Sequence, residues 1–134
     1  MTTRAHGPFD VKINPLQQYN TDDGAKLARM SIDKQFHGEL EAASQGEMLS
    51  AGTDIKGSAG YVAIERVTGT LHGRSGGFTL QHNATMTRGA PALNIIVVPD
   101  SGTGQLMGLT GNMNIIIADG KHSYDFEYRL PQPA

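Results

Sequence analysis

The residues from Phe78 to Thr87 alternate between apolar and polar side chains, and this alternation is the feature that most constrains the fold. One face carries Phe78, Leu80, His82, Ala84 and Met86, and the other carries Thr79, Gln81, Asn83 and Thr85. A period of two over such a run is typical of a β-strand with one face against a core. The sequence therefore predicts a long strand whose apolar face carries one imidazole, His82.

The same period recurs along the chain. We expect further strands at residues 9–15, 28–36, 39–48, 59–67, 93–98, 105–117 and 122–130. Asp23-Gly24 and Asp119-Gly120 supply the positive φ that tight hairpin turns need. About eight strands with short connections predict an all-β fold, a single domain over residues 1–134. An eight-stranded antiparallel up-and-down β-barrel is the expected form, because closing the sheet removes its exposed edges.

Composition excludes several classes of function. The chain has no cysteine, which removes disulfides and thiolate chemistry, and its five histidines lack a compact metal-ligand spacing. A net charge of −2 with scattered Lys and Arg argues against a nucleic-acid binder. Without a membrane-spanning run or a signal peptide, we expect a cytoplasmic protein that does not bind membranes. The glycine-rich loops fit no phosphate-binding motif, so we expect no cofactor and no metal.

Glu65 and His82 are the candidate catalytic residues. If Tyr61, Ala63 and Glu65 face inward, burial would raise the pKa of Glu65 and suit it to act as a general base. His82 would then complete an acid–base pair suited to isomerisation or cyclisation. The alternatives are a solvent-exposed Glu65, with Val62 and Ile64 inward, and a buried His82 that only hydrogen-bonds a neighbour. The alternation of this strand leaves both open, because both of its faces carry apolar residues.

Four further residues are candidates for ligand binding. Tyr61 shares the face of Glu65, Phe78 shares the face of His82, and His122 and Tyr124 begin the last strand. We expect them to line the barrel interior or its mouth, where ring nitrogens and hydroxyls can hydrogen-bond a ligand. The alternative for the last strand is an aromatic core column, Tyr128 included, whose hydroxyls reach the rim of the barrel. Gln81 lies on the opposite face, where we expect contact with an adjacent subunit or the barrel rim.

Several runs together resemble a known family. FHGELEAASQGEML, GYVAIERVTGTLHGRSGGFTLQH, VVPDSGTGQLMGLTG and HSYDFEYRLP resemble an uncharacterised bacterial domain-of-unknown-function family with an allene oxide cyclase-like β-barrel, over roughly residues 36–131. The resemblance implies an eight-stranded antiparallel barrel and a small homo-oligomer, with a dimer favoured. It implies no activity, and the plant cyclase that names the fold shares no active-site pattern with this chain beyond a polar barrel interior.

These features support three functional hypotheses. The leading one is a barrel that binds a small apolar or amphipathic molecule in an apolar cavity with a few polar groups. The second is a cofactor-independent isomerase or cyclase that uses Glu65 and His82. The third is a packed barrel that acts as a structural or interaction module. The first two predict a cavity of roughly 300 Å³ or more, and the third predicts an interior filled by side chains.

Overall fold

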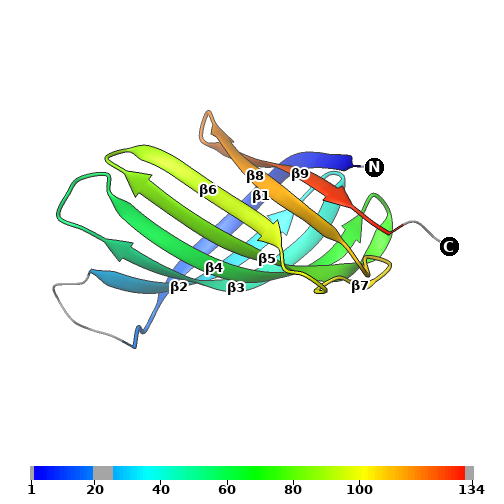
Figure 1. Ribbon diagram of the computed structural model, residues 1–134, viewed down its shortest axis with the longest axis horizontal. Coiled ribbons are helices and arrows are strands. Elements are labelled where there is room, and N and C mark those ends of the chain that lie inside the picture. The colour runs from blue at the N-terminus through cyan, green and yellow to red at the C-terminus, as the bar shows by residue number, and fades with distance from the viewer. Residues whose placement is uncertain (1, 20–25, 132–134) are drawn as a thin grey trace.

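The computed structural model describes residues 2–19 and 26–131, which form β-strands and short connections (Figure 1). The strands are β1 (Thr3–Leu16), β2 (Leu27–Phe36), β3 (Leu40–Gly52), β4 (Ala59–Leu71), β5 (Arg74–Thr87), β6 (Ala90–Val97), β7 (Thr103–Gly104), β8 (Thr110–Ala118) and β9 (Lys121–Arg129). Neither described range contains a helix that could cross a membrane.

Eight of these strands close into an antiparallel barrel. Neighbours around the barrel follow the order β1-β2-β3-β4-β5-β6-β8-β9, and β9 pairs back with β1. The short β7 pairs with the start of β5 and lies outside this circuit. The strands run up and down in chain order, so the predicted eight-stranded antiparallel barrel is confirmed (Figure 1).

The turn predictions have two outcomes. Asp119 and Gly120, with φ values of 53° and 74°, form the hairpin between β8 and β9, as predicted. Both residues adopt the positive φ that a two-residue hairpin of this kind requires. The Asp23-Gly24 turn lies outside the described residues.

The predicted strand over residues 105–117 is wrong in its first part. Residues 105–109 form a compact loop, and β8 begins only at Thr110. The backbone N–H of Leu106 donates to the carbonyl of Thr103, and that of Leu109 donates to the carbonyl of Leu106. Leu106 and Leu109 are both fully buried. In a strand, two residues three positions apart would point to opposite faces. In the turn that they form, both leucines pack against the same end of the barrel.

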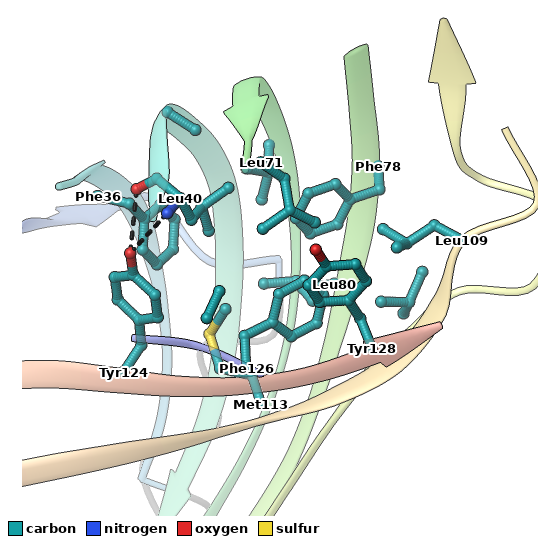
Figure 2. Close-up of a cluster of buried hydrophobic side chains, with 14 of the residues drawn as sticks. Phe36, Leu40, Leu71, Phe78, Leu80, Leu109, Met113, Tyr124, Phe126 and Tyr128 are labelled. Carbon is teal, nitrogen blue, oxygen red and sulfur yellow. Dashed lines mark hydrogen bonds between the residues drawn. The ribbon is translucent and has the colours of Figure 1, made fainter. Parts of the chain in front are cut away.

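That end of the barrel is closed by a packed aromatic and aliphatic core (Figure 2). The ring of Phe126 stacks between Phe78 and Tyr128, with centroid separations of 5.5 and 5.4 Å. The hydroxyl of Tyr124 donates to the carbonyl of His37 (2.6 Å) and accepts from the backbone N–H of Leu40 (2.9 Å). Tyr124 thereby fastens the connection between β2 and β3 to β9, and the inside of this half is filled.

The opposite end is open. Inward-facing apolar side chains at this end are exposed to solvent. Ile13, Met86, Leu93 and Ile117 are 40–67% exposed. The β3–β4, β5–β6 and β8–β9 connections surround this end (Figure 1). The barrel is therefore a cup with one packed half and one open half.

Candidate functional site: a cavity above a buried polar cluster

The structure decides which face of β4 points inward. Glu65 is completely buried and Ala63 is nearly so, whereas Val62 and Ile64 are 51% and 49% exposed. Tyr61 lies on the inner face and lines the open half of the barrel. The alternative that placed Glu65 on the surface is therefore wrong.

Glu65 is the centre of a buried polar cluster built by four neighbouring strands. Its Oε2 accepts hydrogen bonds from Lys34 Nζ (2.9 Å) on β2 and His82 Nε2 (2.5 Å) on β5. Its Oε1 accepts one from the hydroxyl of Ser44 (2.7 Å) on β3. All four side chains are buried, and we call them the polar floor. The three donors together satisfy the carboxylate, which is the condition for burying a charge at tolerable cost.

A glycine makes room for this cluster. Gly46 pairs with Glu65 across β3 and β4. A β-carbon at Gly46 would lie 2.1 Å from the carbonyl oxygen of Ile64 and 2.8 Å from the β-carbon of Glu65. A side chain at this position would force the two strands apart, so the glycine allows them to approach beside the carboxylate.

The expectation that Glu65 has a raised pKa is wrong. Burial does act to raise the pKa of Glu65, but the hydrogen bond from His82 and the charge of Lys34 outweigh it and lower the pKa to about 2. A carboxylate held ionised by donors in this way is a poor proton acceptor near neutral pH. Glu65 is thus suited to fix its partners in place, and the chain offers His82 as the better candidate base.

The electrostatics of the floor are balanced. The Lys34 ammonium neutralises Glu65 and lies over the rings of Phe9 and Phe36, 5.3 and 5.7 Å from their centroids. Because an ionised carboxylate only accepts hydrogen bonds, the shared proton belongs to Nε2 of His82. Nδ1 of His82 is buried and has no hydrogen-bond partner among the described residues. The floor therefore keeps one unused polar atom.

A cavity of about 260 Å³ lies above the floor in the open half of the barrel. Lys34 and His82 border it from below, Tyr61 and His122 from the sides, and its remaining walls are apolar, from Phe9, Val11, Ile13, Ile32, Met48, Leu93, Ile115 and Ile117. A second hollow of about 370 Å³ at the mouth shares Met48, Tyr61, Leu93 and Ile117 with the first. The shared walls make the two spaces adjoin, so the cavity opens toward solvent through an apolar mouth.

The structure distributes the predicted ligand-binding residues between the two halves. Tyr61 and His122 line the cavity, together with His82. Phe78 and Tyr124 lie instead in the packed half, where Phe78 stacks on Phe126 and Tyr124 bonds the backbone. The inner faces of these strands run through both halves. Alternation indicated the inward face for His82, His122, Phe78 and Tyr124 and left that of Tyr61 open, and it showed the depth of none of them along the barrel.

The sequence prediction missed Lys34 and Ser44 as members of the site. Lys34 carried a signal, because it interrupts the apolar face of its strand. An inward lysine requires a buried anion, and Glu65 is that anion. Ser44 carried no signal of its own, since a small polar residue on an inner face is common. No cluster of three or more His, Asp or Glu that could hold a metal occurs among the residues that the structure describes.

Together, fold and site define a small closed antiparallel barrel, one half packed and the other a cup with a buried ionic floor. The model of the family described as "Protein of unknown function (DUF3224)" matches residues 5–128, and the chain belongs to this family. It is also similar to a protein with unknown function from that family in Shewanella oneidensis MR-1, known from its crystal structure. The identity is 54%, both chains are covered completely and the TM-score is 0.94. No curated protein matches the chain.

Proposed function

We propose that this barrel binds a small, largely apolar molecule in the open half of its interior. The observation that carries the proposal is the cavity of about 260 Å³ that adjoins an apolar mouth, directly above polar groups that are fixed in place. Pockets of roughly 300–1,000 Å³ with apolar walls and a few oriented polar groups are typical of small-molecule sites. At about 260 Å³ the inner cavity alone is slightly smaller than the roughly 300 Å³ expected from the sequence, and the mouth extends it.

The walls specify the chemistry of the ligand. A volume of about 260 Å³ limits the inner cavity to a small molecule. Most of its walls come from aliphatic side chains and one phenyl ring, so the body of the ligand is apolar. A charged ligand would lose its hydration against these walls, and Lys34 already has Glu65 as its counterion. We therefore expect an uncharged molecule with at most one or two polar atoms.

Two side chains can orient such a molecule. Burial, and to a smaller extent the charge of Glu65, raise the pKa of Tyr61, so its hydroxyl stays protonated at neutral pH and can both donate and accept. His122 borders the same cavity, and its ring lies 5.4 Å from that of Phe9. A polar atom of the ligand would be held by one of these groups while its body fills the mouth.

The test begins with the protein purified from its own host. Native mass spectrometry, followed by extraction, should find a bound small molecule of low polarity. In parallel, the uncharged fluorophore N-phenyl-1-naphthylamine should bind the protein in a saturable manner. Leu93→Trp, which narrows both hollows, should weaken this binding at least tenfold. Met107→Trp places the same ring on an exposed residue at the closed end and should leave it unchanged.

Two results would contradict the proposal. One is a protein that carries no molecule and does not bind the fluorophore. The other is fluorophore binding that Leu93→Trp and Met107→Trp affect equally, because the probe would then lie outside the barrel. Either result would favour the packed barrel as a structural or interaction module.

A second candidate function follows from the hydrogen bond between Glu65 and His82. A carboxylate that orients an imidazole is the arrangement by which histidine serves as a general base. We propose, as this second candidate, an isomerase or cyclase without a cofactor, in which Nδ1 of His82 takes a proton from a substrate in the cavity and Glu65 positions the ring. If the extracted molecule is converted by the protein, His82→Gln should abolish conversion while the molecule still binds. Unchanged conversion by this variant would eliminate the mechanism.

A further inference from the structure

The outer surface of four neighbouring strands has a central region without charged side chains. We call this region the uncharged face; its outward residues are Val62 and Ile64 on β4, Gln81 and Asn83 on β5, Asn94 and Ile96 on β6, and Asn112, Asn114 and Ile116 on β8. The outward positions of the other four strands are rich in charge, with Arg4, Asp10, Lys12, Arg29, Asp33, Glu41, Glu47, Asp125, Glu127 and Arg129. Most outward charges therefore lie on one side of the barrel, and Arg66 on β4, which bonds the carbonyl of Ser101, borders the uncharged face next to Ile64.

Strand register makes the uncharged face continuous. Ile64 pairs with Gln81, Gln81 with Ile96, and Ile96 with Asn112, so one row crosses all four strands. Glu47 borders this row on β3 and Glu127 borders it on β9. On the β3–β5 side the surface is hollowed by about 550 Å³. Val62, Ile64, Gln81 and Asn83 of the face line this hollow, and the Arg29–Glu47 ion pair borders it.

This composition points to a protein partner. An antiparallel sheet with one face in water usually places polar and charged residues outward, but here Val62, Ile64 and Ile116 are each about half exposed. Depletion of charge together with a larger apolar share is characteristic of the core of a protein–protein interface. A nucleic acid or an anionic membrane surface would require Lys and Arg, which this face lacks.

From these features we infer that the uncharged face is the interface through which two copies of this chain associate. Side-chain amides both donate and accept hydrogen bonds, so Gln81, Asn83 and Asn94 can pair with the same residues of a second copy related by a two-fold axis. The charges at the rim are already compensated within each copy. Glu47 bonds Arg29 at 2.7 Å and Glu127 bonds Arg4 at 2.9 Å, so identical rims do not repel each other strongly.

The face is smaller than a standard protein–protein interface. With strands about 4.8 Å apart and a rise of about 3.3 Å per residue, four strands and five to six residues give a footprint of roughly 350 Å² per copy in projection. Standard interfaces bury about 800 Å² of accessible surface per partner. We therefore expect a dimer with sheets packed face to face that dissociates in the micromolar range.

Sedimentation velocity of the full chain from about 1 to about 200 µM tests this inference, a range that brackets micromolar dissociation. Wild type should shift from monomer to dimer across the range. Gln81→Lys, at the centre of the face, should weaken the dimer at least tenfold. Asn14→Lys also replaces an exposed strand amide by lysine, but on the charged side of the barrel. This variant should dimerise as the wild-type protein does. Far-UV circular dichroism confirms folding, and Asn94→Lys replaces Gln81→Lys if that variant does not fold.

Three outcomes would overturn the inference. If the wild-type protein remains monomeric at the highest concentration, a second copy does not bind the uncharged face, and the partner is a different protein. A dimer that Gln81→Lys and Asn14→Lys weaken equally does not use this face. A larger assembly at all concentrations would require a second interface and would contradict a closed two-fold dimer.

Discussion

Replacing Glu65 by glutamine tests whether the polar floor stabilises the fold as an ionic unit. The substitution keeps the shape of the side chain and removes its charge, which leaves the Lys34 ammonium buried without a counterion in the floor. Removing one partner of a buried ion pair costs about 3–5 kcal/mol. The pKa gives a consistent magnitude: a fall from 4.5 to about 2 corresponds to about 3 kcal/mol, at about 1.4 kcal/mol per pKa unit.

The assay is urea unfolding followed by far-UV circular dichroism, with two readouts. At pH 7, Glu65→Gln should lower the free energy of unfolding by about 3–5 kcal/mol. Because the pKa of Glu65 is lower in the folded state, its contribution is complete above about pH 4.5 and is lost as the pH falls toward 2. The variant should lack this part of the acid destabilisation. Glu47→Gln, which opens an exposed ion pair, is the matched control and should unfold as wild type does.

A companion change separates the charge from the packing. Lys34→Met alone strips Glu65 of its cationic partner and should also destabilise the fold. The double variant with Lys34→Met and Glu65→Gln leaves neither charge, so it should lose much less stability than the sum of the two single variants. Additive single effects, a loss below about 1 kcal/mol for Glu65→Gln, or an unchanged acid transition in that variant would refute the ionic account.

Three further predictions concern the packing. Gly46→Ala should lower the free energy of unfolding by at least about 2 kcal/mol, because its β-carbon would lie 2.1 Å from a carbonyl oxygen of the next strand. Gly52→Ala on the same strand, with its nearest atom at 3.7 Å, is the control, and equal effects would contradict the argument. Tyr124→Phe should cost about 1–3 kcal/mol and speed hydrogen exchange of the Leu40 amide, which loses its acceptor; unchanged exchange would count against this role. Phe126→Ala should cost about 3–5 kcal/mol in thermal unfolding, and a loss below about 1 kcal/mol would show that the closed end is not tightly packed.

The cavity and the uncharged face are separable features of one barrel. The cavity is formed by inward residues of the open half, whereas the face is formed by outward residues of β4, β5, β6 and β8. Successive side chains of a strand point to opposite sides, so neighbours such as Gln81 and His82 belong to different surfaces. A variant of the face can therefore leave the cavity intact, and the two proposals can fail independently.

The sequence alone determined the barrel and the inner residues of most of its strands. A period of two is a local property, so it placed Phe78 and His82 on one inner face and Lys34 on another without knowledge of their neighbours. It failed where the local pattern fitted two structures. In β4 both faces carry apolar residues, and residues 105–109 were predicted as strand although only a turn brings Leu106 and Leu109 to the same side.

Only the tertiary structure decided what the inner residues do. Lys34 and His82 lie 31 and 17 residues from Glu65 in the chain, and their contacts with it reverse the pKa shift that burial alone would cause. The division into a packed half and an open half also depends on the loop that inserts Leu106 and Leu109 at one end. Depth along the barrel follows from strand register and closure, which join distant segments, so alternation within one strand cannot encode it.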